Sequence, residues 1–153
     1  MCNKKAITHH SVISQHKFAM LKLKDNTLDL FLEGEKYLNT LSKTLERKSR
    51  FDNDLLYSIS TMYCEKLFVA LLSHYDEMAE HHMPVALYKQ AKEFEPELTS
   101  AMQDTVRLVN RFESICTLDG FGYKTPTDEE LQKIIIGLQT IHVVVKKRVM
   151  ADA

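Results

Sequence analysis

Scarcity of turn-forming residues constrains this chain more than any other feature of its sequence. Only four glycines and three prolines occur among its 153 residues. Sheet proteins need frequent tight turns, and those turns draw on Gly and Pro. We therefore expect a few long helices joined by few loops. The length fits one domain, since a domain usually has roughly 100–200 residues.

Apolar side chains recur at intervals of three and four along much of the sequence, as they do on a helix with one buried face. The pattern predicts long helices over residues 26–50, 55–78 and 97–115, a short one over 85–94, and a final one beginning at Thr127. The helix over 55–78 is apolar on nearly every side, which is typical of the central helix of a bundle. The predicted fold class is all-α: an up-and-down four-helix bundle with an additional short helix.

Three local signals sharpen this prediction. Thr127 followed three residues later by Glu130 forms a capping box, so the last helix is expected to start here. Gly34 lies on the apolar stripe of the first helix, where it would let a neighbouring helix approach closely. The clearest loop is residues 117–126, which contain two of the four glycines.

Charge separates the N-terminal segment from the rest of the chain. The net charge is −1, yet the first 24 residues contain five lysines and no acid. We expect residues 1–25 to form a basic N-terminal arm or short docked segment and residues 26–153 to form the helical bundle domain. A loosely docked arm is the preferred interpretation, and a phosphate-binding tail is the alternative.

Cysteine spacing and apolar run length bear on the location of the protein. Cys2, Cys64 and Cys116 show neither metal-type nor redox-type spacing, which suits reduced thiols in the cytoplasm. The longest apolar run, residues 67–72, is far shorter than the roughly 20 residues that cross a bilayer. We expect a cytoplasmic protein with no membrane partner.

No self-sufficient catalytic site is recognisable in the sequence. His74, Glu77 and His81 would share one side of a helix end, but neither HExxH nor the paired Glu-x-x-His of di-iron bundles is present, so a solvated helix end is preferred to a metal site. Cys64 is expected to be a small core residue, and His142 a satisfied buried histidine rather than a general base. We expect no catalytic residue, metal or cofactor.

Arg107, Arg111 and Lys124 form the candidate ligand-binding site. The two arginines are one helical turn apart, and Lys124 lies in the loop that follows their helix. Guanidinium groups at this spacing could clamp a phosphate. The alternative is a structural role, in which the arginines pair with nearby acids. The acids considered are Asp104, Glu113 and Asp119.

Residues 57–87 resemble the long helix of the HEPN family, the "higher eukaryotes and prokaryotes nucleotide-binding" helical bundles. The resemblance rests on a Glu-Lys pair, an Ala-Leu-Leu run and a His before the next short helix, here Glu65, Lys66, Ala70, Leu71, Leu72 and His82. A helix ending in Arg111 and Phe112, then a loop, a Thr-Pro-Thr start at residues 125–127 and a final apolar helix extend it over residues 26–150. The resemblance implies a dimeric helical bundle.

Many HEPN proteins are ribonucleases with an Arg-x4-6-His pair, and this chain departs from that pattern. If Arg111 matches the family arginine, the histidine should stand within residues 116–118, which are Cys116, Thr117 and Leu118. Without an imidazole there, general acid–base catalysis lacks its usual agent. The resemblance then implies a non-catalytic homodimer that binds a nucleotide, an RNA or a partner protein, such as a nucleotidyltransferase-type protein of a toxin–antitoxin pair.

Two other functions remain open from the sequence. One is a toxin-like ribonuclease with a non-standard active site, in which His82 or His142 supplies the missing base. It requires one of these histidines to lie close to Arg111 or Arg107. The other is a nucleic-acid-binding regulator that uses the basic N-terminal arm, and its binding would weaken steeply with added salt.

Overall fold

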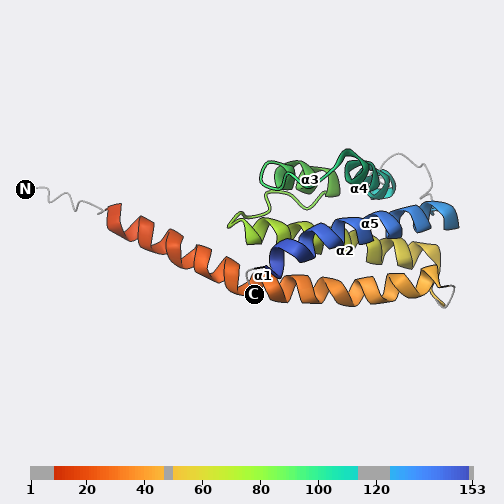
Figure 1. Ribbon diagram of the computed structural model, residues 1–153, viewed down its shortest axis with the longest axis horizontal. Coiled ribbons are helices and arrows are strands. Elements are labelled where there is room, and N and C mark those ends of the chain that lie inside the picture. Colours follow the sequence, from red (N-terminus) through yellow and green to blue (C-terminus); the bar gives the residue numbers. More distant parts are fainter. Residues whose placement is uncertain (1–8, 47–49, 114–124, 152–153) are drawn as a thin grey trace, which may run out of the picture.

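In the computed structural model, the part of the chain that is described forms five helices (Figure 1). The structure describes the backbone of residues 9–46, 50–113 and 125–151, and the side chains of residues 26–46, 50–111 and 125–151. The helices are α1 (His9–Leu45), α2 (Asn53–His74), α3 (Pro84–Lys92), α4 (Ser100–Glu113) and α5 (Asp128–Val149). This part of the chain contains no strand, so the prediction of an all-α fold is confirmed.

The helices lie in three layers, with α2 and α5 in the middle one (Figure 1). Asn53 at the start of α2 donates to Asp128 at the start of α5 over 2.7 Å, so these two helices run in the same direction. α1 packs against both and runs the opposite way, since Thr27 near its middle lies 2.5 Å from Ser73 at the end of α2. α3 and α4 cover the other side, and α4 appears nearly end-on in Figure 1. α1 and α2 are therefore antiparallel, whereas α2 and α5 are parallel.

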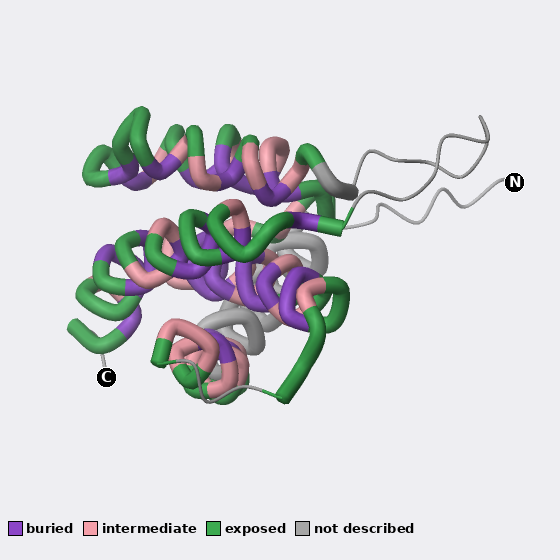
Figure 2. Tube along the Cα trace, turned by 90° about the vertical axis from the view of Figure 1, so that its right-hand side faces the viewer, coloured by how far each residue is buried: buried purple, intermediate pink, exposed green. Residues whose placement is uncertain are grey.

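α2 is the central helix, as its sequence predicts. It packs against each of the other four helices, whereas α1 contacts only α2 and α5 among the described helices. Eleven of its residues are buried, Leu71 and Cys64 completely. Figure 2 shows the buried positions on the sides of the helices that face one another. By length and composition α2 is apolar enough to cross a membrane, and 56% of its most apolar 18-residue window is buried inside the fold.

Side-chain caps fix where several helices begin. The Asp52 carboxylate accepts from the backbone N–H of Leu55 over 2.9 Å and starts α2. Thr127 and Glu130 form the predicted capping box at the start of α5. The expected start of the fourth helix at Glu97 is wrong, because Thr99 provides the cap: its hydroxyl accepts from the N–H of Met102 over 3.4 Å. α4 therefore begins at Ser100.

Two other predicted boundaries differ from the structure. α2 ends at His74, not near residue 78, because Asp76 adopts a positive φ of 61°. The N–H groups of Asp76 and Glu77 then bond back to Ser73 and Leu72, a Schellman motif. The first helix, expected over residues 26–50, spans His9–Leu45 instead, and its N-terminal part extends beyond the other helices in Figure 1.

The glycines Gly34 and Gly137 mark two helix contacts of different closeness. A Cβ atom at Gly34 would lie 3.5 Å from the Cβ of Lys66, an ordinary van der Waals distance. A Cβ atom at Gly137 would lie 2.1 Å from the Oγ1 atom of Thr105, where no side chain fits. The close approach expected at Gly34 is therefore found instead between α4 and α5.

Candidate functional site

The predicted arginine site lies on α4, and each arginine is paired with an acid. Arg107 contacts Asp104 over 3.2 Å, one of the pairings expected of a structural role. Arg111 contacts Glu130 over 3.5 Å and so connects the end of α4 to the start of α5. The two arginine side chains remain 61% and 56% exposed. Lys124 lies outside the described residues, as do Cys116, Thr117 and Leu118, so the structure does not place the third member of this site.

His142 occupies a buried polar centre between α1, α2 and α5. Its Nδ1 atom lies 2.7 Å from the Tyr63 hydroxyl, and its Nε2 atom lies 3.6 Å from the Glu35 carboxylate. Its ring stacks on Phe31 with 5.1 Å between centroids. The prediction of a satisfied buried histidine is confirmed, because both ring nitrogens face polar groups and the residue is 8% exposed.

Electrostatics keep this centre neutral. Burial lowers the pKa of His142, and the opposing effect of Glu35 does not cancel that shift. Burial also raises the pKa of the Tyr63 hydroxyl, so Tyr63 keeps its proton and is able to donate a hydrogen bond to Nδ1 when the imidazole has its proton on Nε2. The imidazole then carries its own proton on Nε2, toward Glu35. A histidine held in this way stabilises the packing of three helices.

A second buried polar centre is charged and involves Arg148, six residues beyond His142 and near the C-terminal end of α5. The fully buried carboxylate of Glu95 accepts from Arg148 Nε over 2.6 Å and from the Tyr75 hydroxyl over 2.8 Å. Burial would raise the pKa of Glu95, but hydrogen bonds from Arg148, the backbone of Glu97 and Tyr75 outweigh it and lower the pKa to about 2. Glu95 is therefore an anion at neutral pH, with its charge compensated.

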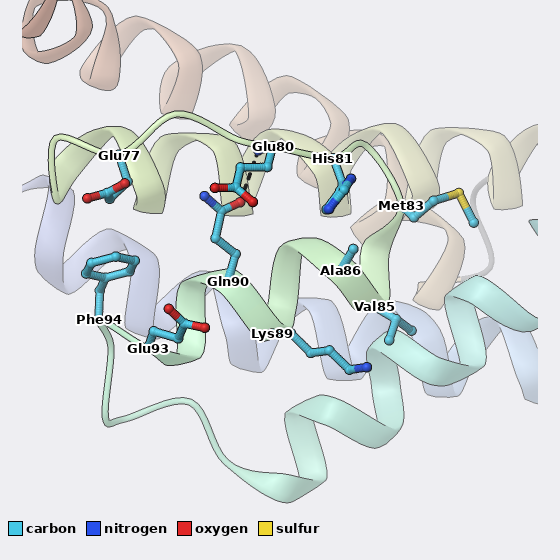
Figure 3. Close-up of a pocket in the computed structure, with 10 residues that line it drawn as sticks. All are labelled: Glu77, Glu80, His81, Met83, Val85, Ala86, Lys89, Gln90, Glu93 and Phe94. Atoms are coloured by element: carbon cyan, nitrogen blue, oxygen red, sulfur yellow. Dashed lines mark hydrogen bonds between the residues drawn. The ribbon is translucent and has the colours of Figure 1, made fainter.

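A surface groove of about 670 Å³ separates α3 from the segment that follows α2. Figure 3 shows the segment on one side and α3 on the other, with side chains from both projecting between them. Gln90 joins the two sides: its amide donates to Met78 O over 2.7 Å and its oxygen accepts from Glu80 N over 3.1 Å. The lining residues are Glu77, Glu80, His81, Met83, Val85, Ala86, Lys89, Gln90, Glu93 and Phe94.

The groove combines apolar side chains with an excess of acidic ones. Three glutamates, Glu77, Glu80 and Glu93, line it together with one lysine, Lys89. Val85, Ala86 and Phe94 supply apolar surface. Such a surface suits a ligand that offers both a positive charge and an apolar group, and it disfavours phosphate groups.

The metal hypothesis assumed that His74, Glu77 and His81 share a helix end, and this premise is wrong. α2 stops at His74, whose ring contacts Tyr75 edgewise at 4.9 Å, whereas Glu77 and His81 line the groove. Among residues with described side chains, no group of three or more His, Cys, Asp or Glu residues is arranged to hold a metal ion. The structure thus assigns two of these residues to the groove.

Sequence reasoning missed most of the groove because it extended α2 through residue 78. With that helix continued, Glu77 would lie on its surface, and no chain would lie opposite α3. The available signal was Asp76, since Asp tolerates a left-handed conformation better than most residues. His82, a histidine considered for catalysis, is exposed and contacts Glu65 over 2.8 Å.

Comparisons with known proteins identified no protein that resembles this chain. A scan of the chain against protein-family models, a search of curated proteins and a search of solved structures each gave no match.

Proposed function

We propose that the protein is a non-catalytic, HEPN-like four-helix bundle that acts in the cytoplasm as a homodimeric partner-binding module. The observation that carries the proposal is the groove beside α3, which combines apolar side chains with three glutamates and one lysine. Its ligand is a protein segment that presents lysine or arginine together with an apolar residue. The HEPN resemblance suggests a nucleotidyltransferase-type protein as the partner.

The placement of the histidines supports a binding role over the ribonuclease alternative. His142 is enclosed by Tyr63 and Glu35. Arg111 contacts α5 at Glu130, twelve residues before His142. That separation corresponds to about 18 Å along a helix, which is too far for the two side chains to act on one substrate within a chain.

Binding of basic peptides tests the proposal. The probe is a fluorescent peptide with alternating lysine and leucine, and its glutamate–leucine counterpart serves as the negative probe. We expect micromolar binding of the lysine peptide that weakens with salt, and about a tenfold loss in the double variant Glu80→Lys/Glu93→Lys. Asp29→Lys is the control, because Asp29 is an exposed acid on α1 that does not line the groove. Equal losses in the two proteins would refute the groove as the binding site.

The exposure of Arg107 and Arg111 favours a second candidate function, nucleotide or RNA binding on α4. If a phosphate competes successfully with Asp104 and Glu130, Arg111→Ala should weaken binding by about 1–3 kcal/mol through loss of a charge-assisted hydrogen bond. A labelled RNA should remain intact with both proteins. Cleavage by the wild type that disappears in Arg111→Ala would instead establish the ribonuclease alternative.

A further inference from the structure

The groove beside α3 is bounded at one end by the chain itself. The segment that follows α2 runs along α3 in the opposite direction, because Gln90, near the end of α3, bonds to the early part of this segment. The segment then joins α3 at Pro84, so the two walls of the groove meet there. Met83 and Val85 lie at this end, which we call the closed end (Figure 3).

The opposite end of the groove, which we call the acidic end, gathers negative charge. Glu77 on the segment and Glu93 just after α3 lie there together with the ring of Phe94 (Figure 3). α2 ends at His74 and α3 at Lys92, so the negative ends of two helix dipoles add to the two carboxylates. An aromatic ring also attracts a cation. The acidic end therefore suits a lysine or arginine side chain of the ligand.

The lysine that lines the groove lies away from the acidic end. Side chains on a helix lean toward its N-terminus, so Lys89 leans toward Val85, one turn before it, and away from Glu93, one turn after it. Figure 3 shows the Lys89 side chain extending to the Val85 side. Among the residues with described side chains, none forms an ion pair with Lys89, Glu77 or Glu93. Both ends of the groove thus offer a charge to a ligand.

The length of the groove sets the size of its ligand. Val85 and Glu93 are eight residues apart, which corresponds to about 12 Å along a helix. An extended chain rises about 3.3 Å per residue, so about four ligand residues span that distance. At the closed end the ligand chain must either turn out of the groove or terminate.

We propose that the groove binds the carboxyl-terminal segment of a partner protein. Its last residue is apolar and packs against Met83 and Val85, its α-carboxylate pairs with Lys89, and a lysine or arginine three residues earlier binds at the acidic end. This inference rests on the proposed function and names the part of the partner that the groove takes.

A chain terminus fits the closed end better than an internal segment does. A terminal residue has its side chain and its carboxylate on the same Cα atom, so it supplies an apolar group and an anion at one place. An internal segment would have to turn beside Met83, and its backbone would offer Lys89 only a neutral carbonyl. An acidic side chain would bring an anion but would still require that turn.

Fluorescence anisotropy with three matched peptides tests the terminal carboxylate. Each peptide carries a fluorophore at its N-terminus and the sequence Lys-Ser-Ser-Leu. The first ends at the leucine with a free carboxylate, the second ends there with an amide, and the third continues with a short glycine–serine extension. The amide and the extended peptide should bind about tenfold more weakly than the acid, because neither places an anion at Lys89. Equal affinity of the three peptides would overturn the proposal.

Substitution of Lys89 tests which group meets the carboxylate. In Lys89→Gln the acid peptide should bind about tenfold more weakly, and the amide peptide should bind as it does to the wild type. Lys43→Gln is the control, because Lys43 is an exposed lysine on α1 that does not line the groove, and it should leave both affinities unchanged. Circular dichroism establishes that the variants are folded. An equal loss for acid and amide peptides in Lys89→Gln would overturn the pairing.

Glu93→Gln separates this inference from the function on which it rests. It should weaken the acid and the amide peptide by the same factor, about fivefold, because both carry the lysine that binds at the acidic end. If acid and amide bind equally and Glu93→Gln weakens both, the groove remains a binding site for basic segments and the terminal carboxylate is refuted. If none of the peptides binds, the proposed function and this inference both fail.

Discussion

The two buried polar centres of this protein contrast in how they tolerate burial. The Glu95 centre is charged and relies on Arg148, and the His142 centre is neutral and relies on the Tyr63 hydroxyl. Both anchor α5 to the rest of the fold, at positions only six residues apart along that helix. A buried charge requires an opposite charge, whereas a buried neutral ring requires only hydrogen bonds. The two centres should therefore respond differently to mutation and to pH.

Removing the cation of the charged centre should have the largest effect. Arg148→Ala leaves the Glu95 carboxylate buried without its main partner, and we expect a loss of about 3–5 kcal/mol in the free energy of unfolding. Urea denaturation followed by circular dichroism measures the loss. The double variant Glu95→Leu/Arg148→Met removes both charges and should be less destabilised than the single one. If the two are equally destabilised, the centre does not depend on charge compensation.

Acidification should lower the free energy of unfolding through the Glu95 centre, by somewhat less than Arg148→Ala does. The pKa of Glu95 is lowered from 4.5 to about 2, so its contribution is complete above pH 4.5 and is lost as the pH falls toward 2. A shift of that size corresponds to roughly 3 kcal/mol. Urea midpoints measured between pH 6 and pH 2 test this, with Glu95→Gln as the control. The wild type should lose more stability than the variant over the same range.

Removing the hydroxyl of the neutral centre should have a smaller effect than removing Arg148. Tyr63→Phe leaves His142 Nδ1 buried without its donor, and we expect a loss of about 1–2 kcal/mol. The matched control is Tyr88→Phe, because the Tyr88 hydroxyl donates over 2.8 Å to the backbone carbonyl of Thr99 and touches no imidazole. Urea midpoints of both variants at pH 5.5 and pH 8 provide the measurement. Only Tyr63→Phe should change how the urea midpoint depends on pH.

The smallest effect should come from protonation of His142 itself. Its pKa is lowered by burial, so the unfolded chain binds the proton more readily than the folded one. The contribution of neutral His142 to the free energy of unfolding is therefore fully present above the ordinary histidine pKa of 6.5. It is lost as the pH falls below that value. The urea midpoint of the wild type should fall as the pH is lowered from 7.5 to 5.5. The midpoint of His142→Gln should fall less over the same range. An unchanged slope would mean that His142 does not titrate differently in the two states.

Apolar periodicity and capping residues predicted the features that depend on one helix at a time. The all-α fold, the central position of α2, the capping box at Thr127 and the burial of His142 follow from patterns within single helices. The Glu95–Arg148 pair was not predicted, because its members are 53 residues apart and no local pattern links them. The groove was missed because a single residue, Asp76, ends α2 where apolar periodicity does not.

The order of the helices has a consequence for synthesis on the ribosome. α1 and α2 emerge first and pair with each other, but the face of α2 that packs against α5 must wait for the last helix of the bundle. The end of α5 lies 75 residues beyond the end of α2, a delay of about 4–15 s at ordinary rates of bacterial and eukaryotic translation. Throughout that interval the most apolar helix of the chain is only partly covered. The nascent protein should therefore depend on chaperones more than the stability of its finished core would suggest.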